Sequence, residues 1–317
     1  MGEFELIERF FNRPAQRNPL GVGDDCALLA PAPGMQLAVS SDMLVEGRHF
    51  LAGTDPRRLG HKCLAVNLSD LAACGARPLA FTLALALPAA DAGWLEPFSQ
   101  GLLALADAHG CELVGGDTTR GPLTVCITVF GEVPAGQALL RSGARADDDL
   151  YVSGSLGDAR LALEAARGTL TVPAPVLAAA RERLDAPTPR VALGLGLRGI
   201  ATSAIDISDG LLGDLGHVLR QSGVAATVDA DAAASLLEAG STLEPGLRRA
   251  YALAGGDDYE LAFTAPAVAR EAVQAAASRA GTRVKRIGRI DAGSGLRLVD
   301  AQGRPVPGDF PSFDHFA

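Results

Sequence analysis

The sequence predicts a mixed α/β protein of two domains, and three observations support this class. The chain has 317 residues and is 48% hydrophobic, which is enough to bury a full core. Strand-like runs near residues 37, 81, 113 and 127 are interspersed with segments of helical periodicity. A stretch rich in Gly, Pro and charge begins at residue 133. We therefore predict an N-terminal domain over 1–137, a linker over 138–149 and a C-terminal α/β domain over 150–317.

The N-terminal elements follow in order along the chain. Residues 5–11 place apolar side chains at helical spacing, and residues 36–42 form a strand with a polar end. A helix starting at 54–56 is followed by strand 81–87, a helix over 94–109 and strands near 113 and 127. We interpret this as a β-α-β-β-α-β order of ferredoxin-like type. Because one layer of two helices leaves part of an apolar sheet uncovered, we also predict a homodimer.

The C-terminal half starts with a strand, a glycine turn and a helix over 150–158. Residues 204–212 carry two acids at the start of an amphipathic helix, and 255–263 repeat a turn followed by a strand. The triple aspartate at 147–149 is predicted to be a solvated turn. Residues 194–199 match G-x-G-x-x-G, but they follow a Pro-rich segment instead of a strand, so we interpret the match as chance.

Charge and cysteine content exclude several classes of partner and site. A net charge of −9 without a basic patch argues against nucleic acid or an anionic membrane as a partner. Five cysteines without a C-x-x-C pair indicate neither a disulfide framework nor a zinc site. The N-terminal residues lack the pattern of a signal peptide, and no apolar run is long enough to span a membrane. We therefore expect a cytoplasmic protein.

Asp70 is the most informative acid, because it lies inside the small and apolar run 65–76. Ionised carboxylates are rarely buried unless they are paired, hydrogen-bonded or bound to a cation. The chain has further aspartates beside Gly, Ser or Thr, namely Asp24, Asp25, Asp42, Asp117, Asp206 and Asp209. Such oxygen-rich turns favour hard cations, so we predict that they bind Mg²⁺, which in turn holds a polyphosphate.

Structural alternatives stay open for several of these residues. The turn at 21–26 also fits a hairpin with two solvated aspartates, and Asp209 also fits a helix cap. His49 alone fits a structural or surface histidine. A P-loop is excluded, because neither Lys62 nor Lys285 follows the required glycine, and no G-x-S-x-G elbow is present. ATP would therefore have to be held by aspartates and Mg²⁺.

Taken together, the motifs resemble those of thiamine-monophosphate kinases. They occur in the family's order along essentially the whole chain: 21–26 (GVGDDC), 40–42 (SSD), 67–70 (NLSD), 115–122 (GGDTTRGP), 203–210 (SAIDISDG), 255–260 (GGDDYE) and 313–316 (FDHF). The resemblance implies ATP-dependent conversion of thiamine monophosphate to thiamine diphosphate. It also implies the fold of the aminoimidazole-ribonucleotide synthetase superfamily, with a homodimer whose N-terminal sheets form a shared barrel.

The resemblance also implies a role for individual residues. The implied magnesium ligands are Asp25, Ser40, Ser41, Asp42, Asp70, Asp117, Asp206 and Asp209. The implied ATP contacts are Gly116, Asp117, Arg141 and Ser208, and the implied thiamine-monophosphate contacts are His49, Asp257 and Phe313. Asp257 and Phe313 stand where a common form of the pattern has Glu and Tyr or Trp.

The implied chemistry needs no general base, because the attacking group is the phosphate of the substrate, whose second pKa is about 6. Mg²⁺ would offset the repulsion between this dianion and ATP and align the two for in-line transfer. Two alternatives stay open: another ATP-using enzyme of the superfamily, similar to aminoimidazole-ribonucleotide or selenophosphate synthetases, and a non-catalytic module that binds metal or nucleotide.

Overall fold

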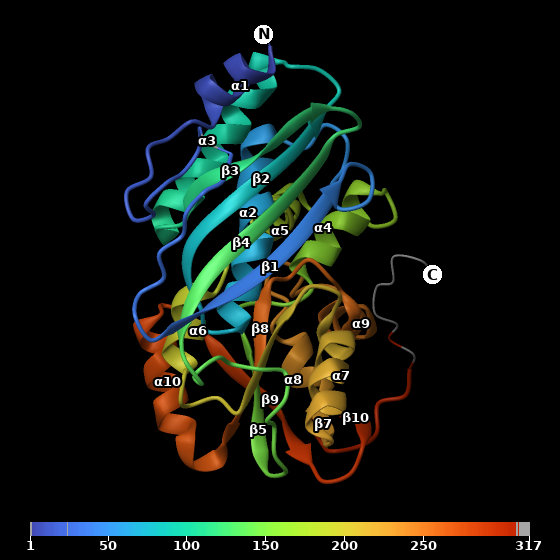
Figure 1. The fold of residues 1–317 in the computed structure, drawn as a ribbon. Coiled ribbons are helices and arrows are strands. Elements are labelled where there is room, and N and C mark those ends of the chain that lie inside the picture. Colours follow the sequence, from blue (N-terminus) through green and yellow to red (C-terminus); the bar gives the residue numbers. More distant parts are fainter. Residues whose placement is uncertain (1, 24, 309, 311–317) are drawn as a thin grey trace. The chain divides into compact units, whose positions relative to one another are not determined.

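The computed structural model describes residues 2–23, 25–308 and 310, and it has the predicted mixed α/β architecture (Figure 1). The chain divides into two compact units. Unit 1 comprises Met1–Leu71 and Ala76–Gly136, and unit 2 comprises Ala72–Gly75 and Gln137–Ala317. No helix in the described residues is both long and apolar enough to cross a membrane.

Unit 1 is built on a four-stranded sheet. Its elements are α1 (Glu3–Phe10), β1 (Met35–Val45), α2 (Pro56–Ala73), β2 (Arg77–Leu87), α3 (Ala92–His109), β3 (Glu112–Arg120) and β4 (Thr124–Pro134). The strand order is β1-β4-β2-β3, with β4 antiparallel to both neighbours and β2 parallel to β3. The β-α-β-β-α-β order that we predicted was wrong. The individual elements were predicted in their observed sequence, which gives the order β-α-β-α-β-β, and α3 is the crossover helix that the parallel β2–β3 pair requires.

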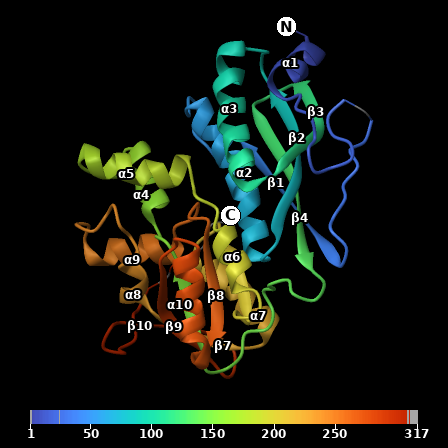
Figure 2. The same cartoon turned by 90° about the vertical axis from the view of Figure 1, so that its left-hand side faces the viewer.

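Helices α2 and α3 cover one face of this sheet (Figure 2). Fully buried side chains from α2, α3 and β2 form the core between the layers, among them Leu64, Leu68, Phe98 and Phe81. The two helices touch backbone to backbone at two glycines. A Cβ atom at Gly60 would lie 2.1 Å from the carbonyl oxygen of Phe98, and one at Gly101 would lie 1.8 Å from that of Arg57. Only glycine therefore permits this helix crossing.

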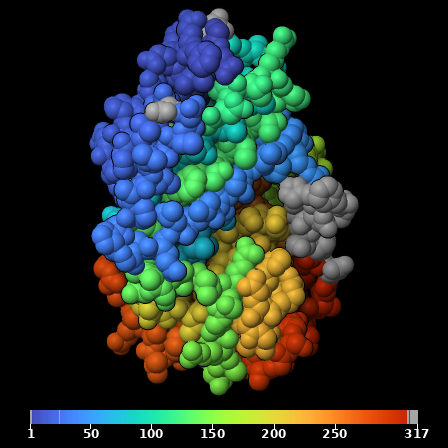
Figure 3. Space-filling view, viewed as in Figure 1, coloured from blue at the N-terminus to red at the C-terminus, as the bar shows by residue number. Residues whose placement is uncertain are grey.

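The opposite face of the sheet carries apolar side chains that reach the surface. Strand β1 is an edge strand, and its Leu37, Val39 and Met43 are 45%, 58% and 56% exposed. These residues are spaced by even numbers, so they share one face of the strand. Strands β1 and β4 turn this face toward the viewer in Figure 1, and Figure 3 shows both strands at the surface of unit 1.

Unit 2 is built on a six-stranded sheet in the order β10-β7-β9-β5-β8-β6. Its strands are β5 (Asp148–Ser153), β6 (Ser203–Ile207), β7 (Ala225–Asp229), β8 (Glu260–Pro266), β9 (Val284–Asp291) and β10 (Gly295–Val299). Its helices are α4 (Asp158–Ala166), α5 (Ala174–Asp185), α6 (Val191–Leu197), α7 (Leu211–Ser222), α8 (Ala230–Ala234), α9 (Pro245–Ala254), η1 (Ala267–Ala269) and α10 (Arg270–Arg279). Figure 1 shows α6 and α10 on one side of the strands and α7, α8 and α9 on the other. Strands β5 and β8 are accordingly buried along nearly their whole length.

Of the triple aspartate, only Asp147 lies in an exposed turn as we predicted, and the prediction was wrong for Asp148 and Asp149. Asp148 and Asp149 are 4% and 3% exposed and begin the central strand β5. Asp149 accepts hydrogen bonds from Arg270 and Arg286, while Thr202 donates one to Asp148. The charge is buried here because arginines distant in the sequence neutralise it.

The G-x-G-x-x-G match at 194–199 is placed in helix α6 and the turn after it, not after a strand. A Cβ atom at Gly194 would lie 2.0 Å from the carbonyl oxygen of Ala72, so this glycine permits a close approach between two backbone segments of unit 2. The interpretation of this match as chance agrees with the structure.

Candidate functional site

In unit 1, predicted site residues from β1 and α2 meet. Asn67 and Asp70 lie three residues apart on α2 and so share one face of the helix. The Ser40 hydroxyl donates a hydrogen bond to Asp70 Oδ2 over 2.5 Å, and the Asp42 N–H donates to Asn67 Oδ1 over 3.2 Å. Asn67 is fully buried and donates in turn to the Cys63 carbonyl oxygen over 3.0 Å. The amide of Asn67 thus fixes α2 against β1. The side chains of Asp42 and Asp70, on these two elements, are half-buried.

Ser41 points away from this group, because neighbouring residues of a strand alternate between its faces. Its hydroxyl donates to the Ile127 carbonyl oxygen over 3.1 Å and lies 3.0 Å from the Thr128 hydroxyl on β4. The side chains of Ser40 and Ser41 are therefore on opposite faces of the sheet. This geometry does not favour the binding of one ion by both hydroxyls.

Gly116 and Asp117 lie on β3, at the far edge of the sheet from β1. The register aligns Asp42 with Ile127, Ile127 with Leu83 and Leu83 with Gly116. Three strand spacings separate the two ends of this row, which is roughly 14 Å. The predicted ligands of unit 1 thus form two groups, one around Asp70 and one on β3.

A cavity of about 470 Å³ follows directly after Asp117 along β3. It has apolar walls and a few polar groups, and it is lined by Glu3, Leu6, Leu87, Pro88, Ala89, Ala90, Thr118, Thr119 and Arg120. This composition is typical of pockets that bind small molecules. The predicted ATP residues Gly116 and Asp117 precede this cavity along β3 and are not among its described lining residues.

His49 and Asp25 occupy loops of unit 1. His49 ends a tight turn after β1, and its Nδ1 accepts a hydrogen bond from the Val45 N–H over 3.0 Å. This bond leaves Nε2 to carry the proton in the neutral ring. Asp25 is exposed in the loop before β1. Asp24 and Phe313 lie outside the described residues.

In unit 2, a third group of predicted residues forms around the end of β6. The N–H groups of Ser208 and Asp209 both donate to Asp214 Oδ2, over 3.0 and 3.1 Å. Asp206 is 6% exposed on β6, and Asp209 is half-buried. Burial raises the pKa of the Asp214 carboxyl to about 7, while the donated N–H groups and the nearby charge of Arg141 act to lower it.

Arg141 belongs to this group because its segment is tied to both β6 and α7. The Ala204 N–H donates to the Leu140 carbonyl oxygen over 2.9 Å, and the Ser222 hydroxyl donates to the Arg141 carbonyl oxygen over 3.2 Å. The charge of Arg141 also acts on His217, whose pKa is lowered by burial, by Arg220 and by Arg141. The predicted linker is thus packed onto unit 2 where it carries Arg141.

Asp257 is bonded to the same segment through its backbone. Its N–H donates to the carbonyl oxygen of Ser208 over 2.8 Å. The Tyr259 N–H donates to the carbonyl oxygen of Ile207 over 2.8 Å. Asp257 and Tyr259 have positive φ angles of 63° and 51°, which are strained for residues with side chains. The Tyr259 hydroxyl also donates to Asp257 Oδ1 over 3.0 Å. Asp257, Ser208 and Asp209 are therefore held in one turn assembly.

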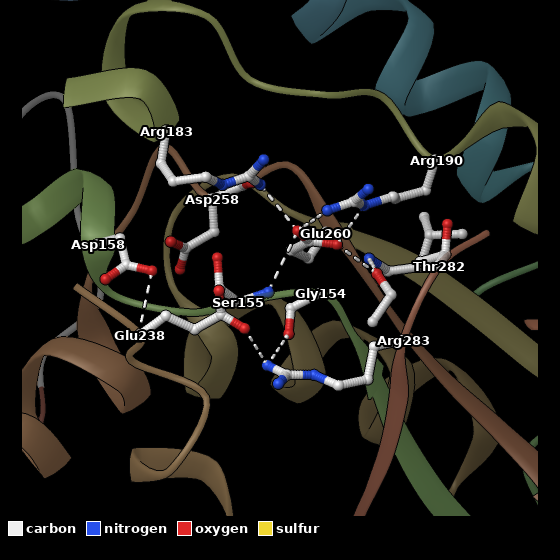
Figure 4. Close-up of polar contacts among 12 residues, drawn as sticks. Gly154, Ser155, Asp158, Arg183, Arg190, Glu238, Asp258, Glu260, Thr282 and Arg283 are labelled. Carbon is white, nitrogen blue, oxygen red and sulfur yellow. Dashed lines mark hydrogen bonds and ion pairs between the residues drawn. The ribbon is translucent and has the colours of Figure 1, made fainter. Parts of the chain in front are cut away.

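Behind this turn lies a buried network of acids and arginines (Figure 4). Glu260 is fully buried, and both Arg183 and Arg190 donate to its carboxylate. Arg183 also donates to the Asp258 carbonyl oxygen over 3.0 Å. The Gly157 N–H donates to Asp258 Oδ1 over 2.9 Å, and burial raises the pKa of Asp258 well above its usual range. These contacts hold the strained segment 257–259 at both sides of Asp258.

The metal-ligand prediction has one structural test in the described residues. There, no three side chains of His, Cys, Asp or Glu come together as a ligand set. The Ser40 hydroxyl and the Asp70 carboxylate are oxygen ligands, which is the chemistry that Mg²⁺ prefers. Mg²⁺ is commonly held by one or two carboxylates together with phosphate oxygens and water, so the group of Ser40, Asp42 and Asp70 fits such an ion.

Sequence reasoning missed Asp214 and the Glu260 network. Asp214 lies among Leu211, Leu215 and Val218 on the buried face of α7, so it is an acid on an apolar helix face, as Asp70 is. That signal was readable in the sequence. The partners of Glu260 were not, because Arg183 and Arg190 lie 77 and 70 residues away along the chain.

Comparisons with known proteins agree with this fold. The family model of the AIR synthase related protein, N-terminal domain, matches residues 23–133, and that of the C-terminal domain matches residues 145–301. The chain is 46% identical to the thiamine-monophosphate kinase of Salmonella typhimurium over 329 aligned residues, which cover 100% of this chain and 98% of the relative. It is 44% identical to that of Escherichia coli K12, with the same coverage.

Solved structures give the same picture. A crystal structure of thiamine-monophosphate kinase from Stenotrophomonas maltophilia K279a has a TM-score of 0.85 and 47% identity, covering 96% of each chain. The structure described as AaThiL complexed with AMPPCP and TMP has a TM-score of 0.76 and 29% identity, covering 90% of this chain and 89% of that one. The hydrogenase maturation protein HypE of Escherichia coli, at 22% identity and a TM-score of 0.75, shares the fold.

Proposed function

The chain belongs to the thiamine-monophosphate kinase family, and on this premise we propose that it transfers the γ-phosphoryl group of ATP to thiamine monophosphate. The products are thiamine diphosphate and ADP. The observation that carries the proposal is the 46% identity over the full chain to a relative of that name. A related structure in complex with AMPPCP, an ATP analogue, and TMP supports the same pair of substrates. The alternative of another ATP-using superfamily member receives less support, because the HypE likeness extends to the fold alone.

The residues of this chain bind and orient the two phosphate groups, and none is needed as a general base. The acceptor phosphate is mostly ionised at neutral pH, because its second pKa is about 6. We propose that Gly116, Asp117, Arg141 and Ser208 contact ATP, since these positions match the family motifs. The guanidinium of Arg141 supplies positive charge to the ATP phosphates.

Mg²⁺ is part of this proposal, and it would neutralise the phosphate oxygens and align them for in-line transfer. The residues proposed to hold it are Asp25, Ser40, Ser41, Asp42, Asp70, Asp117, Asp206 and Asp209. The oxygen donors beside Asp70 support the assignment most strongly. Ser41 has the weakest support, because its side chain bonds to β4.

We also propose His49, Asp257 and Phe313 as contacts for thiamine monophosphate. The Val45 N–H orients the His49 ring through Nδ1, and the Tyr259 hydroxyl orients the carboxylate of Asp257. Carboxylate and imidazole groups suit a ligand that combines a cationic thiazolium with an aminopyrimidine. Phe313 lies outside the described residues and stays a prediction.

A homodimer in which two copies bury the β1 face completes the proposal. The exposed Leu37, Val39 and Met43 support it, because monomers rarely leave such apolar stripes uncovered. A cytoplasmic location, and the expectation that neither nucleic acid nor a membrane is a partner, stay predictions.

A direct assay tests the proposed reaction. The purified chain is mixed with ATP, MgCl₂ and thiamine monophosphate, and thiamine diphosphate and ADP are quantified by chromatography. We expect equal amounts of both products. ADP without thiamine diphosphate, or no turnover, would contradict the proposal.

Asp70→Asn sharpens this test, because Asn keeps the shape of the side chain and removes its charge. We expect turnover to fall about a hundredfold or more, since a metal-ligand interaction is worth several kcal/mol in the transition state. Melting in metal-free buffer should be unchanged or improved, because a carboxylate repulsion is relieved. Asp107→Asn, at a surface ion pair with Arg13, is the control and should keep full activity. Lower stability with retained activity in Asp70→Asn would show that Asp70 is structural.

A further inference from the structure

Asp214 is a buried carboxylate that no motif assigned to the site. It is 5% exposed and lies in the first turn of α7. The N-cap of this helix is Gly210, which has no side chain with which to cap. Asp214 Oδ2 instead reaches back and accepts the N–H groups of Ser208 and Asp209, over 3.0 and 3.1 Å. One oxygen atom thus fixes two consecutive peptide units immediately before the helix.

The Ser208 peptide is also held from its other end. Its carbonyl oxygen accepts the Asp257 N–H over 2.8 Å, and a Cβ atom at Gly256 would lie 2.6 Å from that same oxygen. Ser208 is therefore held at its N–H group by Asp214 and at its carbonyl oxygen by the 255–257 turn. A peptide bonded at both ends loses most of its rotational freedom, so the direction in which the Ser208 and Asp209 side chains leave the backbone is fixed.

We propose that Asp214 is a positioning residue that holds Ser208 and Asp209 in the geometry that binds Mg²⁺-ATP. This inference rests on the proposed function, because it takes Ser208 as an ATP contact and Asp209 as a magnesium ligand. Asp214 touches neither ligand in this proposal. It acts through the two N–H groups, which lie 5 and 6 residues before it in the chain.

Unit 2 contains a matched control for this arrangement. Asp229 Oδ1 also accepts two backbone N–H groups, those of Asp231 and Ala232, over 3.0 and 2.9 Å. It caps α8, and none of the proposed site residues is among its partners. Replacement of Asp229 by Ala removes the same number of hydrogen bonds of the same type. This variant therefore shows the effect of losing bonds that serve the structure alone.

The test compares the wild type with Asp214→Ala, Asp214→Asn and Asp229→Ala. AMPPCP is titrated calorimetrically in the presence of MgCl₂, which needs no turnover, and KM values for ATP and thiamine monophosphate are measured alongside melting temperatures. We expect Asp214→Ala to weaken AMPPCP binding and raise the KM for ATP about tenfold, because the two hydrogen bonds that fix the Ser208 and Asp209 peptides are lost. The KM for thiamine monophosphate should rise less, because that effect passes through the Ser208–Asp257 bond. Asp214→Asn should recover most of the affinity, since its amide oxygen still accepts both N–H groups.

The outcomes separate this inference from the proposed function. Asp229→Ala should lower the melting temperature and leave the affinity for AMPPCP unchanged. If Asp214→Ala binds AMPPCP like the wild type, or if Asp229→Ala weakens binding equally, the positioning role is wrong. The same holds if Asp214→Asn is no better than Asp214→Ala. A wild type that binds AMPPCP and forms no thiamine diphosphate would overturn the proposed reaction and leave the role of Asp214 intact.

Discussion

The two sheets of this chain differ in how their apolar faces are covered. In unit 2, helices lie on both sides of the strands, and all six residues of β5 are buried. In unit 1, α2 and α3 cover one side, while β1 exposes Leu37, Val39 and Met43 on the other. The six-stranded sheet is thus covered on both faces within one chain, whereas the four-stranded sheet leaves apolar side chains exposed on one face.

The complete sheet of unit 2 also buries charge, and it does so with arginines from its own chain. Glu260 is fully buried between Arg183 and Arg190, and Asp149 is held by Arg270 and Arg286. A buried carboxylate with its countercharge in the same unit serves the fold. Unit 1 also buries a charge with its own arginines, because Glu132 is 2% exposed and pairs with Arg17 and Arg77. The two units therefore differ in how their apolar faces are covered.

The largest effect is expected at the open face of unit 1. Val39→Lys combined with Met43→Lys should convert a dimer to monomers, because each buried apolar side chain contributes about 1.5–3 kcal/mol and the pair occurs in both copies. Light scattering should then give one chain mass of 32.5 kDa instead of twice that value. Val268→Lys is the control, since Val268 is 96% exposed in unit 2 and should leave the mass unchanged. A wild type that is already monomeric would remove the contrast between the two sheets.

The second effect concerns the charge buried in unit 2. Glu260→Ala should lower the free energy of unfolding by about 3–5 kcal/mol, because it leaves Arg183 and Arg190 without the carboxylate that neutralises them. Denaturant unfolding followed by circular dichroism measures this change. Asp107→Ala breaks an ion pair whose partners are 43% and 62% exposed, and it should lose less than about 1 kcal/mol. Similar losses in both variants would show that burial does not decide the strength of these pairs.

The third effect concerns the covered face of unit 1. Gly101→Ala should lower the free energy of unfolding by about 1–3 kcal/mol, because the added Cβ atom meets the Arg57 carbonyl oxygen at 1.8 Å and forces α2 and α3 apart. Gly93→Ala in the same helix is the matched control. Its Cβ atom meets the side chain of Asp91 at 3.3 Å, and alanine favours the helix. Equal stability of both variants would mean that the helix crossing is not close-packed.

Much of this fold could be predicted from local patterns. The strands at β1, β2, β3 and β4 lie where alternating or apolar runs placed them, and α3 ends at His109 as its periodicity indicated. The sheet order was not predictable in this way, because β4 pairs with β1 and β2 through contacts between residues far apart in the sequence. The same limit explains the wrong prediction for Asp148 and Asp149. Arg270 and Arg286 lie 121 and 137 residues beyond Asp149, so no local pattern showed that the charge would be buried.

The candidate site was readable where an acid interrupts an apolar surface. Asp70 was identified on that ground, and its neighbours Ser40 and Asp42 do lie against α2. Asp214 carries the same signal on α7 and was overlooked. The sequence-based prediction also grouped Ser41 with Ser40 as magnesium ligands, although neighbouring residues of a strand point to opposite faces of the sheet. The roles of these residues stay predictions until the proposed variants are measured.

The smallest effect is a pH dependence at Asp149 in unit 2. Hydrogen bonds from Arg270, opposed by burial and assisted by Arg286, lower the pKa of this carboxyl from 3.8 to about 2. A carboxyl whose pKa is lower in the folded state stabilises the protein fully above its unfolded value, and this contribution disappears as the pH falls. The loss should therefore occur between about pH 4 and pH 2. Because both arginines are 54% exposed, solvent screening limits the contribution to about 1 kcal/mol.

Asp149→Asn tests this pH dependence, since the amide cannot ionise. The melting temperature of the wild type should exceed that of the variant at pH 6, and the difference should narrow between pH 4 and pH 2.5 as the wild-type carboxylate becomes protonated. Asp107→Asn, measured over the same range, controls for the loss of one surface carboxylate. A difference that stays constant down to pH 2.5 would show that Asp149 contributes through packing and neutral hydrogen bonds.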